Sequence, residues 1–570
     1  MNDTKLGQPL AQEKPCLVQT SRGFSVSYKG RFLYSKYDPA KSTIQTINSL
    51  NLLPGTLIFC VSPVLWYGLK ELLKILPEES FIVAIESENE LYDFANEKLE
   101  ELKKDFSLDS KLPLIFLNQE QAKNIAKLIY EGVEFPPLYT FKRAILLEMS
   151  GGTFFANDFY KQIQIIAQNI IASFWKNRLT LVKLGRLFSR NLFHNLSNLE
   201  NSYDLKNIYK KVSKPILIFG AGETTEQFLR EVPKEQIEKC FVLAVDAALP
   251  ILRDFKIHVD GIAAVESQVA ITKAYIANDA KDAILFADMT SRMQITKLAG
   301  NKLTYFTSSY DNSHFLKRLN EKKLLPPMFP ALGSVGLYAV YLALNLRSSP
   351  QKNPIFITGL DFSFSLGKTH ANGAPAHLQR LASTNRLTPV ENYGAAFRPG
   401  AKFFIGKNNV PIFTDIGLSG YAEQFLQAFY GQQNLYDLGF QGIPLGIQQC
   451  NYEQFLDFVQ QIHSEEKFST KNIFVKQTSK GQILAFLEGE EKALNRMKEL
   501  LIFGNDVACC GKTVTQELSE LLQQREYLYL HFPDGFKCDV ENVSFLKRVR
   551  SEIDFFLKDI KRSLQELSKN

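Results

Sequence analysis

The chain has few cysteines and no long apolar run, and both shortages restrict what it can be. Seven cysteines are scattered over 570 residues, only Cys509 and Cys510 are adjacent, and no C-x-x-C pair occurs. This spacing argues against a disulfide framework or a cysteine zinc site and predicts a reduced, cytoplasmic protein. No stretch approaches the roughly 18 apolar residues that span a bilayer, and the polar N-terminus lacks the apolar segment of a signal peptide.

Excess charge of one sign is also missing. The net charge is +6, with 66 Lys and Arg against 60 Asp and Glu, and the basic residues are spread widely. Such a mild excess does not predict nucleic-acid binding but suits a small anionic ligand. A strict D-x-D triplet, the metal-binding carboxylate pair of diphosphate-sugar transferases, is absent from the sequence. At this length we expect two or three domains.

What the chain does contain is a series of short apolar runs between residues 214 and 266. Runs at 216–219, 241–245 and 259–265 are rich in Val, Ile, Leu, Phe and Ala, which is typical of strands buried on both faces. Segments of helical character separate the runs. The order predicts a parallel sheet and therefore an α/β, Rossmann-like domain.

A glycine turn follows the first of these runs. Gly220, Ala221 and Gly222 allow a sharp turn and a close approach of the backbone to a ligand. The helix that follows presents its N-terminal amide groups at the same place, so we predict contact with a nucleotide or phosphate. The alternative is a tight turn without a ligand, because the third glycine of a dinucleotide fingerprint is missing.

Three polar residues lie at other predicted strand or helix ends. Asp246 closes the second strand, and Glu266 follows the third, where open α/β sheets bind their ligands. Ser334 precedes a helix that ends near Leu346, and its hydroxyl and the helix amides suit a phosphate. For Asp246 and Ser334, a plain helix N-cap is the alternative.

A polar loop after a strand at 354–358 holds the remaining candidates. The strand leads to Gly359 and Asp361, and the loop then carries Lys368 and His370 between two glycines. Histidine suits the role of a general base near neutral pH, and the lysine is a candidate to stabilise a departing phosphate. The alternative for the histidine is a hydrogen bond to the loop backbone.

Five strings now stand in a recognisable order: GAGETT, AVDAALPIL, IHVDGIAAVESQ, GSVGLYAVYLAL and PIFITGLDFSFSLGKTHANG. Together they resemble the motility accessory factor family of flagellin glycosyltransferases, over most of the chain. That family shares its central domain with archaeal 6-hydroxymethylpterin diphosphokinase-like proteins, and the central part also looks like bacterial sialyltransferases that use CMP-activated sugars. The chain departs from the family pattern at Glu223-Thr224 and at Glu266-Ser267.

The resemblance implies a transferase that moves a nonulosonic acid from its CMP ester to Ser or Thr of flagellin. CMP leaves with one phosphate, so we expect no metal and no cofactor beyond the CMP-activated sugar as donor. Glu266, Lys368 and His370 are the candidate catalytic residues. One alternative is an ATP- and Mg-dependent diphosphokinase with Asp246 and Glu266 as metal ligands. Another is a catalytically inactive flagellin-binding protein.

We expect three regions along the chain. Residues 1–205 are predicted to form an N-terminal α/β domain with a helical connector, residues 206–450 the Rossmann-like catalytic domain, and residues 451–570 a helical domain. Within the first region, residues 136–205 are predicted to be helical throughout. An apolar stripe from Leu546 to Leu567 predicts an amphipathic helix that packs against other C-terminal helices, with a partner-binding coiled coil as the alternative.

Overall fold

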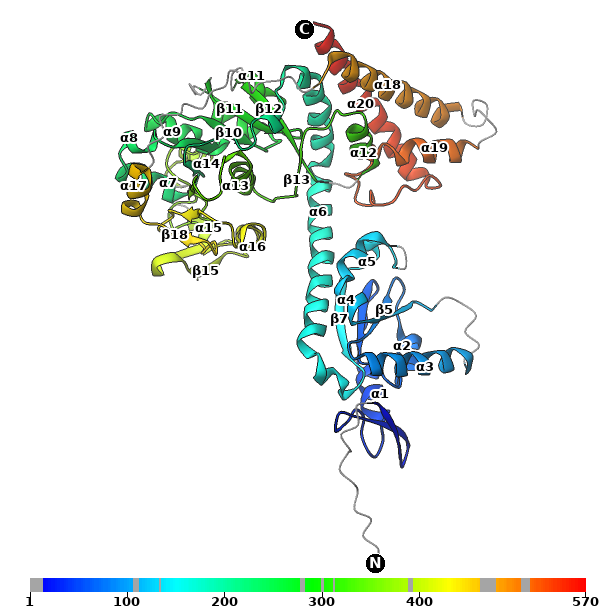
Figure 1. The fold of residues 1–570 in the computed structure, drawn as a ribbon. Helices are drawn as coiled ribbons and strands as arrows, with labels where there is room; N and C mark the ends of the chain where they lie inside the picture. The colour runs from blue at the N-terminus through cyan, green and yellow to red at the C-terminus, as the bar shows by residue number, and fades with distance from the viewer. Residues whose placement is uncertain are drawn as a thin grey trace, which may run out of the picture. The chain divides into compact units, whose positions relative to one another are not determined.

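The computed structural model divides the chain into two compact units, Met1–Thr180 and Leu181–Asn570 (Figure 1). Helix α6 (Asn157–Asn198) contributes residues to both. The structure describes residues 14–105, 112–132, 135–276, 282–298, 302–310, 313–387, 393–461, 478–503 and 513–569. Cys509 and Cys510 lie outside the described residues. The predicted division into three regions stays a prediction.

The first unit is built around a parallel sheet with the strand order β6-β5-β4-β7. Its helices and strands are β1 (Cys16–Thr20), β2 (Gly23–Tyr28), β3 (Arg31–Phe32), α1 (Lys41–Asn48), β4 (Thr56–Val61), α2 (Leu69–Ile75), β5 (Phe81–Glu86), α3 (Asn89–Asp105), β6 (Leu114–Asn118), α4 (Gln119–Lys123), α5 (Ile125–Glu131), β7 (Arg143–Glu148) and the start of α6. The α/β character predicted for this part of the chain is confirmed.

The prediction of helix throughout residues 136–205 is wrong at its beginning. Residues 143–148 form β7, which pairs in parallel with β4 along its whole length. Periodicity alone does not distinguish a short apolar run in a strand from one in a helix. These six residues form a strand because they pair with β4, on the side of β4 opposite to β5.

The second unit contains a nine-stranded sheet with the order β13-β12-β11-β10-β9-β8-β14-β17-β18, parallel throughout. Its strands are β8 (Ile216–Phe219), β9 (Phe241–Val245), β10 (Gly261–Ala264), β11 (Ile284–Asp288), β12 (Lys302–Ser308), β13 (Met328–Phe329), β14 (Ile355–Thr358), β17 (Leu435–Asp437) and β18 (Gln448–Gln449). The apolar runs predicted as buried strands all lie in this sheet, and every residue of β8, β9 and β10 is buried. The α/β, Rossmann-like fold is thereby confirmed.

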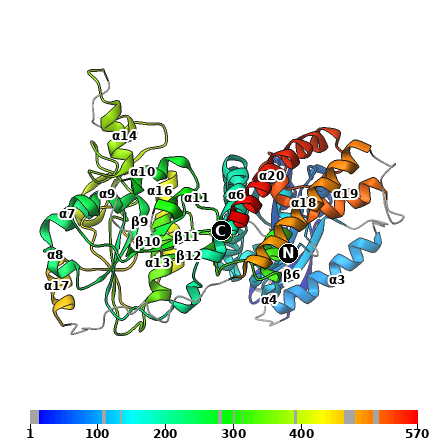
Figure 2. The same cartoon turned by 90° about the horizontal axis from the view of Figure 1, so that it is seen from above.

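Helices connect and cover these strands (Figure 2). They are α7 (Glu223–Glu231), α8 (Lys234–Ile237), α9 (Leu249–Asp254), α10 (Thr272–Tyr275), α11 (Met293–Leu298), α12 (His314–Glu321), α13 (Val335–Leu346), α14 (Pro375–Ser383), α15 (Tyr393–Ala396), α16 (Ile416–Phe429) and α17 (Tyr452–Gln461). The apolar helix α13 packs on β8, β9 and β10, which explains why it is buried over most of its surface. An antiparallel hairpin, β15 (Lys402–Ile405) and β16 (Pro411–Thr414), completes this part of the unit.

The C-terminal residues of the second unit are helical, as predicted. They form α18 (Lys480–Phe503), α19 (Val514–Gln523) and α20 (Val543–Lys569). The predicted apolar stripe lies on α20, where Val549, Ile553, Phe556 and Ile560 are buried. Helix α20 packs along α18, so the stripe is the core of this helical group.

Candidate functional site

The strand order of the second unit creates a reversal point between β8 and β14. From β8 the chain proceeds through β9, β10, β11 and β12 on one side, and then returns to add β14 on the other side. Open α/β sheets bind ligands outside the carboxyl ends of the strands at such a point. The predicted site residues Gly220, Gly222, Gly359 and Asp361 all lie there, directly after β8 and β14.

The two turns at this point approach each other so closely that only glycine fits. A Cβ atom on Gly220 would lie 2.2 Å from the carbonyl oxygen of Gly359, and one on Gly359 would lie 2.6 Å from the carbonyl oxygen of Gly220. The amide of Gly220 donates to Thr358, and that of Gly222 donates to Gly359 at 2.9 Å. Packing of the chain on itself therefore accounts for the glycines, and contact between the turn at Gly220, Ala221 and Gly222 and a ligand stays a prediction.

Asp361 occupies the amino end of α7. Its carboxylate accepts hydrogen bonds from the Thr224 amide at 3.1 Å and from the Thr224 hydroxyl, and a Cβ on Gly222 would lie 2.4 Å from its Oδ2. Burial raises the pKa of Asp361 to about 6, against the opposing charge of Lys407 and the bonds from Thr224. A phosphate at the amino end of α7 would have to compete with the Asp361 carboxylate for the Thr224 amide.

Lys368 belongs to an ion-pair network on the same helix. Its ammonium lies 2.5 Å from Glu226 of α7, and Asn372 donates to the same carboxylate through its backbone and side-chain amides at 3.1 and 3.0 Å. Burial by itself would raise the pKa of Glu226, but the bonds from Lys368 and Asn372 lower it. The lysine thus ties its loop to α7, and its predicted contact with a departing phosphate stays a prediction.

Asp246 is a buried candidate residue with one carboxylate oxygen that lacks a hydrogen bond to the described part of the chain. It is 2% exposed, its Oδ1 accepts from the Ala247 amide at 2.8 Å, and its Oδ2 has no hydrogen-bond partner among the described residues. Burial, together with the nearby charge of Glu266, raises its pKa to about 7. Buried polar atoms are almost always hydrogen-bonded, so the free Oδ2 marks this carboxyl as a candidate contact for a ligand or a water molecule.

Tyr275 of α10 accompanies Asp246 and was not predicted from the sequence. Its hydroxyl is buried and has no hydrogen-bond partner within the described part of the chain. Its pKa is raised far above its ordinary value, first by burial and then by the charge of Asp246. A single tyrosine in a short helix carries no sequence signal, because only the packing of α10 on the segment after β9 brings the two groups together.

Glu266 and Ser334 lie at the same edge of the sheet. The Glu266 carboxylate is half-buried and accepts a hydrogen bond from the Gln268 amide at 2.9 Å. The pKa of Tyr421 is raised first by burial, then by the charge of Asp415 and then by the charge of Glu266. Ser334 caps α13 by accepting from the Gly336 amide at 3.3 Å. The Tyr421 ring lies beside Gly333, the residue before Ser334.

His370 stands on the loop that packs over the first glycine turn. The next residue, Ala371, donates its amide to the Ala221 carbonyl at 3.0 Å. Burial lowers the pKa of His370 below its ordinary value of 6.5, and the charges of Arg380 and His377 lower it further. Its Nδ1 lies 3.1 Å from the Thr369 hydroxyl, so the imidazole is held by a hydrogen bond within the loop.

The two helix starts that were predicted to bind phosphate differ in charge. Helix α7 has Glu223 and Glu226 in its first turn and the Asp361 carboxylate at its end, whereas the first turn of α13 contains no acidic residue. A helix N-terminus favours an anion through its amides and its dipole. Since the acidic groups at α7 already supply that negative charge, α13 with Ser334 is the better candidate for a phosphate.

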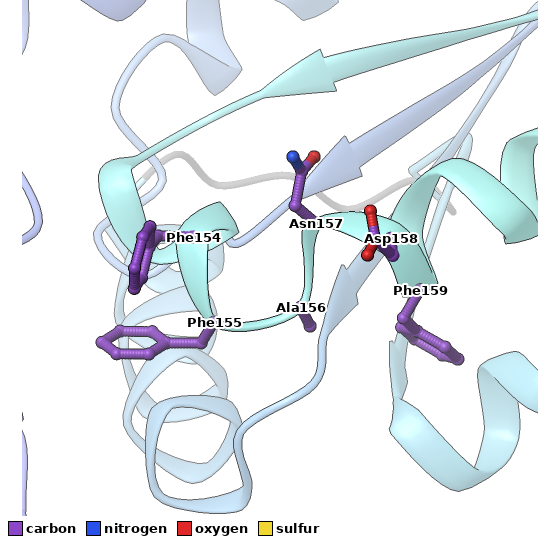
Figure 3. A pocket seen from close by; sticks show the side chains of 6 residues that line it. All are labelled: Phe154, Phe155, Ala156, Asn157, Asp158 and Phe159. Atoms are coloured by element: carbon purple, nitrogen blue, oxygen red, sulfur yellow. The ribbon is translucent and has the colours of Figure 1, made fainter.

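The hollow of the first unit contains none of the predicted residues. It has a volume of about 380 Å³ and is lined by the consecutive residues 154–159 (Figure 3). The rings of Phe154 and Phe155 meet edge to face there, with centroids 5.9 Å apart. We place the candidate site at the carboxyl edge of the nine-stranded sheet instead, because buried, incompletely bonded titratable groups gather there.

Two features are absent from the part of the chain that the structure describes. No group of three His, Cys, Asp or Glu residues there is arranged to hold a metal ion. None of the described helices has both the length and the apolar character needed to cross a membrane.

Comparisons with known proteins extend over nearly the whole chain. Residues 189–367 match the family model described as 6-hydroxymethylpterin diphosphokinase MptE-like. An uncharacterized protein of Treponema pallidum (strain Nichols) is 31% identical over 574 residues, which is 96% of this chain and 95% of that protein. The MAf glycosyltransferase from Magnetospirillum magneticum AMB-1 has a similar fold, with a TM-score of 0.53 at 12% identity over 98% of this chain and 93% of that one.

Proposed function

Because this chain belongs to the family of motility accessory factor-like proteins, with an MptE-like central domain, we propose that it is a glycosyltransferase. The proposed reaction moves a nonulosonic, sialic-acid-like sugar from a CMP donor to a Ser or Thr hydroxyl of flagellin. The observation that carries the proposal is the carboxyl edge of the nine-stranded sheet. The reaction makes three demands: to hold the nucleotide, to stabilise the departing phosphate and to activate the acceptor. The free Oδ2 of buried Asp246, the amino end of α13, which has no acidic residue in its first turn, and His370 suit these demands in turn.

The first two demands are to hold the nucleotide and to stabilise the departing phosphate. In the proposed complex the free Oδ2 of Asp246 bonds a ribose hydroxyl or the base, with Glu266 positioning the sugar. The amides at the start of α13 and the Ser334 hydroxyl receive the phosphate. Lys368 supplies further positive charge if the ligand displaces it from Glu226.

The third demand is to activate the acceptor. When Nδ1 of His370 donates to the Thr369 hydroxyl, Nε2 carries the lone pair and takes the proton of the acceptor hydroxyl. The acceptor oxygen then forms its bond to the anomeric carbon as the bond from that carbon to the phosphate oxygen breaks. CMP leaves with the electron pair, so the atoms and charges balance without a redox partner.

A second candidate function rests on the match of residues 189–367 to the MptE-like family. In that case the chain is an ATP- and Mg-dependent diphosphokinase acting on a pterin-like substrate. Asp246 and Glu266 are then the candidate magnesium ligands, since Mg²⁺ is bound through one or two carboxylates together with substrate phosphates.

Calorimetry with CMP, with ATP, and with ATP and Mg²⁺ separates these functions. The transferase predicts binding of CMP without metal, and Asp246→Asn should weaken that binding. Asp457→Asn, at an exposed aspartate of α17, serves as the matched control. Binding of ATP only with Mg²⁺ supports the kinase, and no nucleotide binding at all supports a non-catalytic flagellin-binding protein. Mass spectrometry of flagellin from a deletion strain then tests transfer, because the sugar should be missing.

A further inference from the structure

The hairpin of β15 and β16 exposes an unusual amount of apolar surface. All four residues of β15 are exposed, with Phe403 at 62%, Phe404 at 45% and Ile405 at 50%. Nearby, Phe397 is 73% and Ile416 is 84% exposed. Figure 1 draws this hairpin in yellow at the margin of the second unit, with α15 and α16. Large exposed apolar patches on soluble proteins commonly mark interaction sites.

The register of the hairpin shows which backbone groups of β15 form hydrogen bonds with β16 and which do not. Phe413 of β16 exchanges both backbone hydrogen bonds with Phe364, each at 2.8 Å, so its backbone groups point away from β15. Phe403 lies opposite Phe413, so these two residues form a pair without hydrogen bonds between them. Hydrogen-bonded and non-hydrogen-bonded pairs alternate along an antiparallel ladder, so Phe404 is in a hydrogen-bonded pair and Ile405 is not. The N–H and C=O groups of Phe403 and Ile405 consequently point outward, and no described residue bonds to them.

An open strand edge of this kind recognises an extended polypeptide. Proteins usually protect such edges with charges, prolines or covering segments. Strand β15 has one charged residue, Lys402, and otherwise presents two aromatic rings and an isoleucine beside its four open backbone groups. Adding a strand satisfies those groups, and neighbouring apolar side chains supply specificity. The chemistry fits a polypeptide in extended conformation with apolar side chains.

The hairpin is also tied directly to the loop of the candidate site. Phe364, which bonds to Phe413, lies between Asp361 and Lys368 on the segment that leads to His370. The rings of Phe364 and Phe413 stack with centroids 6.1 Å apart. A polypeptide added to β15 would be paired to the same small sheet as the loop that carries the proposed general base.

We propose that the acceptor polypeptide docks on this chain as an added strand along the open edge of β15. The proposal rests on the proposed transferase function, which supplies a polypeptide acceptor. An acceptor segment added there would belong to the same small sheet as Phe364, with β15 and β16 between them. At a spacing of about 4.8 Å between neighbouring strands, a hydroxyl farther along the acceptor chain could reach the site. A second copy of this chain, paired edge to edge through β15, is the competing occupant that the experiment must separate.

Hydrogen exchange of the full-length chain tests the proposal directly, with purified flagellin as the probe. The amides of Phe403 and Ile405 should exchange at least about tenfold more slowly when flagellin is added, because they gain hydrogen bonds. The amide of Phe404, which the register assigns to a bond with β16, should not change. Absence of protection at Phe403 and Ile405 overturns the proposal, as does protection that depends only on the concentration of this chain.

A pair of substitutions at one position isolates the backbone contact. Ile405→Pro removes an outward N–H at a strand edge, where proline is tolerated, and Ile405→Thr removes similar apolar surface but keeps the N–H. Transfer to flagellin should fall at least about tenfold further for the proline variant than for the threonine variant. Equal loss in the two variants contradicts strand addition.

Release of CMP from the donor in water distinguishes this proposal from the transferase function itself. Both variants should keep the wild-type rate of CMP release, because Ile405 is not part of the nucleotide site. If wild-type chain releases no CMP, the transferase function fails. If it releases CMP but flagellin neither protects β15 nor responds to Ile405→Pro, the docking proposal alone fails.

Discussion

At the scale of single residues, burial sets the protonation of the groups in the candidate site. It raises the pKa of the Asp246 carboxyl and lowers the pKa of the His370 imidazole, since desolvation disfavours the charged form of each. Titratable groups with pKa values shifted by burial are typical of sites that bind ligands or move protons. Each shift leads to a separate measurement.

His370→Ala should lower the rate of sugar transfer by roughly 10²- to 10⁴-fold, the usual contribution of a general base. CMP binding should change little. Because the pKa of His370 lies below 6.5, transfer by the wild type should decline only as the pH falls below that value. His258→Ala, at an exposed histidine, is the control in the same purified assay. Near-normal transfer by the His370 variant would rule it out as the base and direct attention to His377 or Glu266.

Asp246→Asn should change the pH dependence of stability. The folded-state pKa of about 7 lies above the ordinary 3.8, so the contribution of Asp246 is fully present below 3.8 and is lost as the pH rises through 7. The neutral asparagine avoids this loss. The gain in free energy of unfolding of the variant over the wild type should therefore be larger at pH 8 than at pH 5, by on the order of a few kcal/mol. Thermal unfolding of both proteins at the two pH values measures this difference. A constant offset across this range would contradict the assignment.

At the scale of secondary-structure elements, the turns after β8 and β14 interlock. Gly220→Ala should lower the free energy of unfolding by on the order of 1–3 kcal/mol, because its methyl group would lie 2.2 Å from a backbone oxygen that cannot move aside cheaply. Gly367→Ala is the matched control, since nothing lies within 4 Å of its added Cβ. Thermal unfolding measures both. An unaffected Gly220 variant would show that the turns can separate, as ligand entry between them requires.

At the scale of the whole molecule, the metal requirement separates the two candidate activities. In the proposed transfer the CMP donor leaves with a single phosphate, which does not demand a bridging metal ion. Transfer should therefore continue unchanged after dialysis against EDTA. Loss of turnover that Mg²⁺ restores would instead favour the diphosphokinase. The matching readout is the Mg²⁺ dependence of ATP binding by calorimetry.

The central strands of the nine-stranded sheet and the residues that follow them were predictable from local sequence, whereas the short strands β13, β17 and β18 were not. A strand buried on both faces needs a continuous apolar run, and the polar residue after it must lie at the carboxyl edge. The local pattern of apolar residues predicted β8, β9 and β14 together with Asp246 and Gly359. It failed at β7, whose six residues take their conformation from pairing with β4.

By itself, the sequence determined the parallel α/β fold, the apolar stripe of α20 and the residues available at the strand ends, since each depends on the local spacing of apolar residues. Only the tertiary structure decided that β14 lies beside β8, that Asp361 fills the end of α7, and that Tyr275 stands next to Asp246. It also decided that β15 keeps an open edge. These features depend on which distant segments become neighbours, and pairing energies between distant segments leave no periodic pattern in the chain.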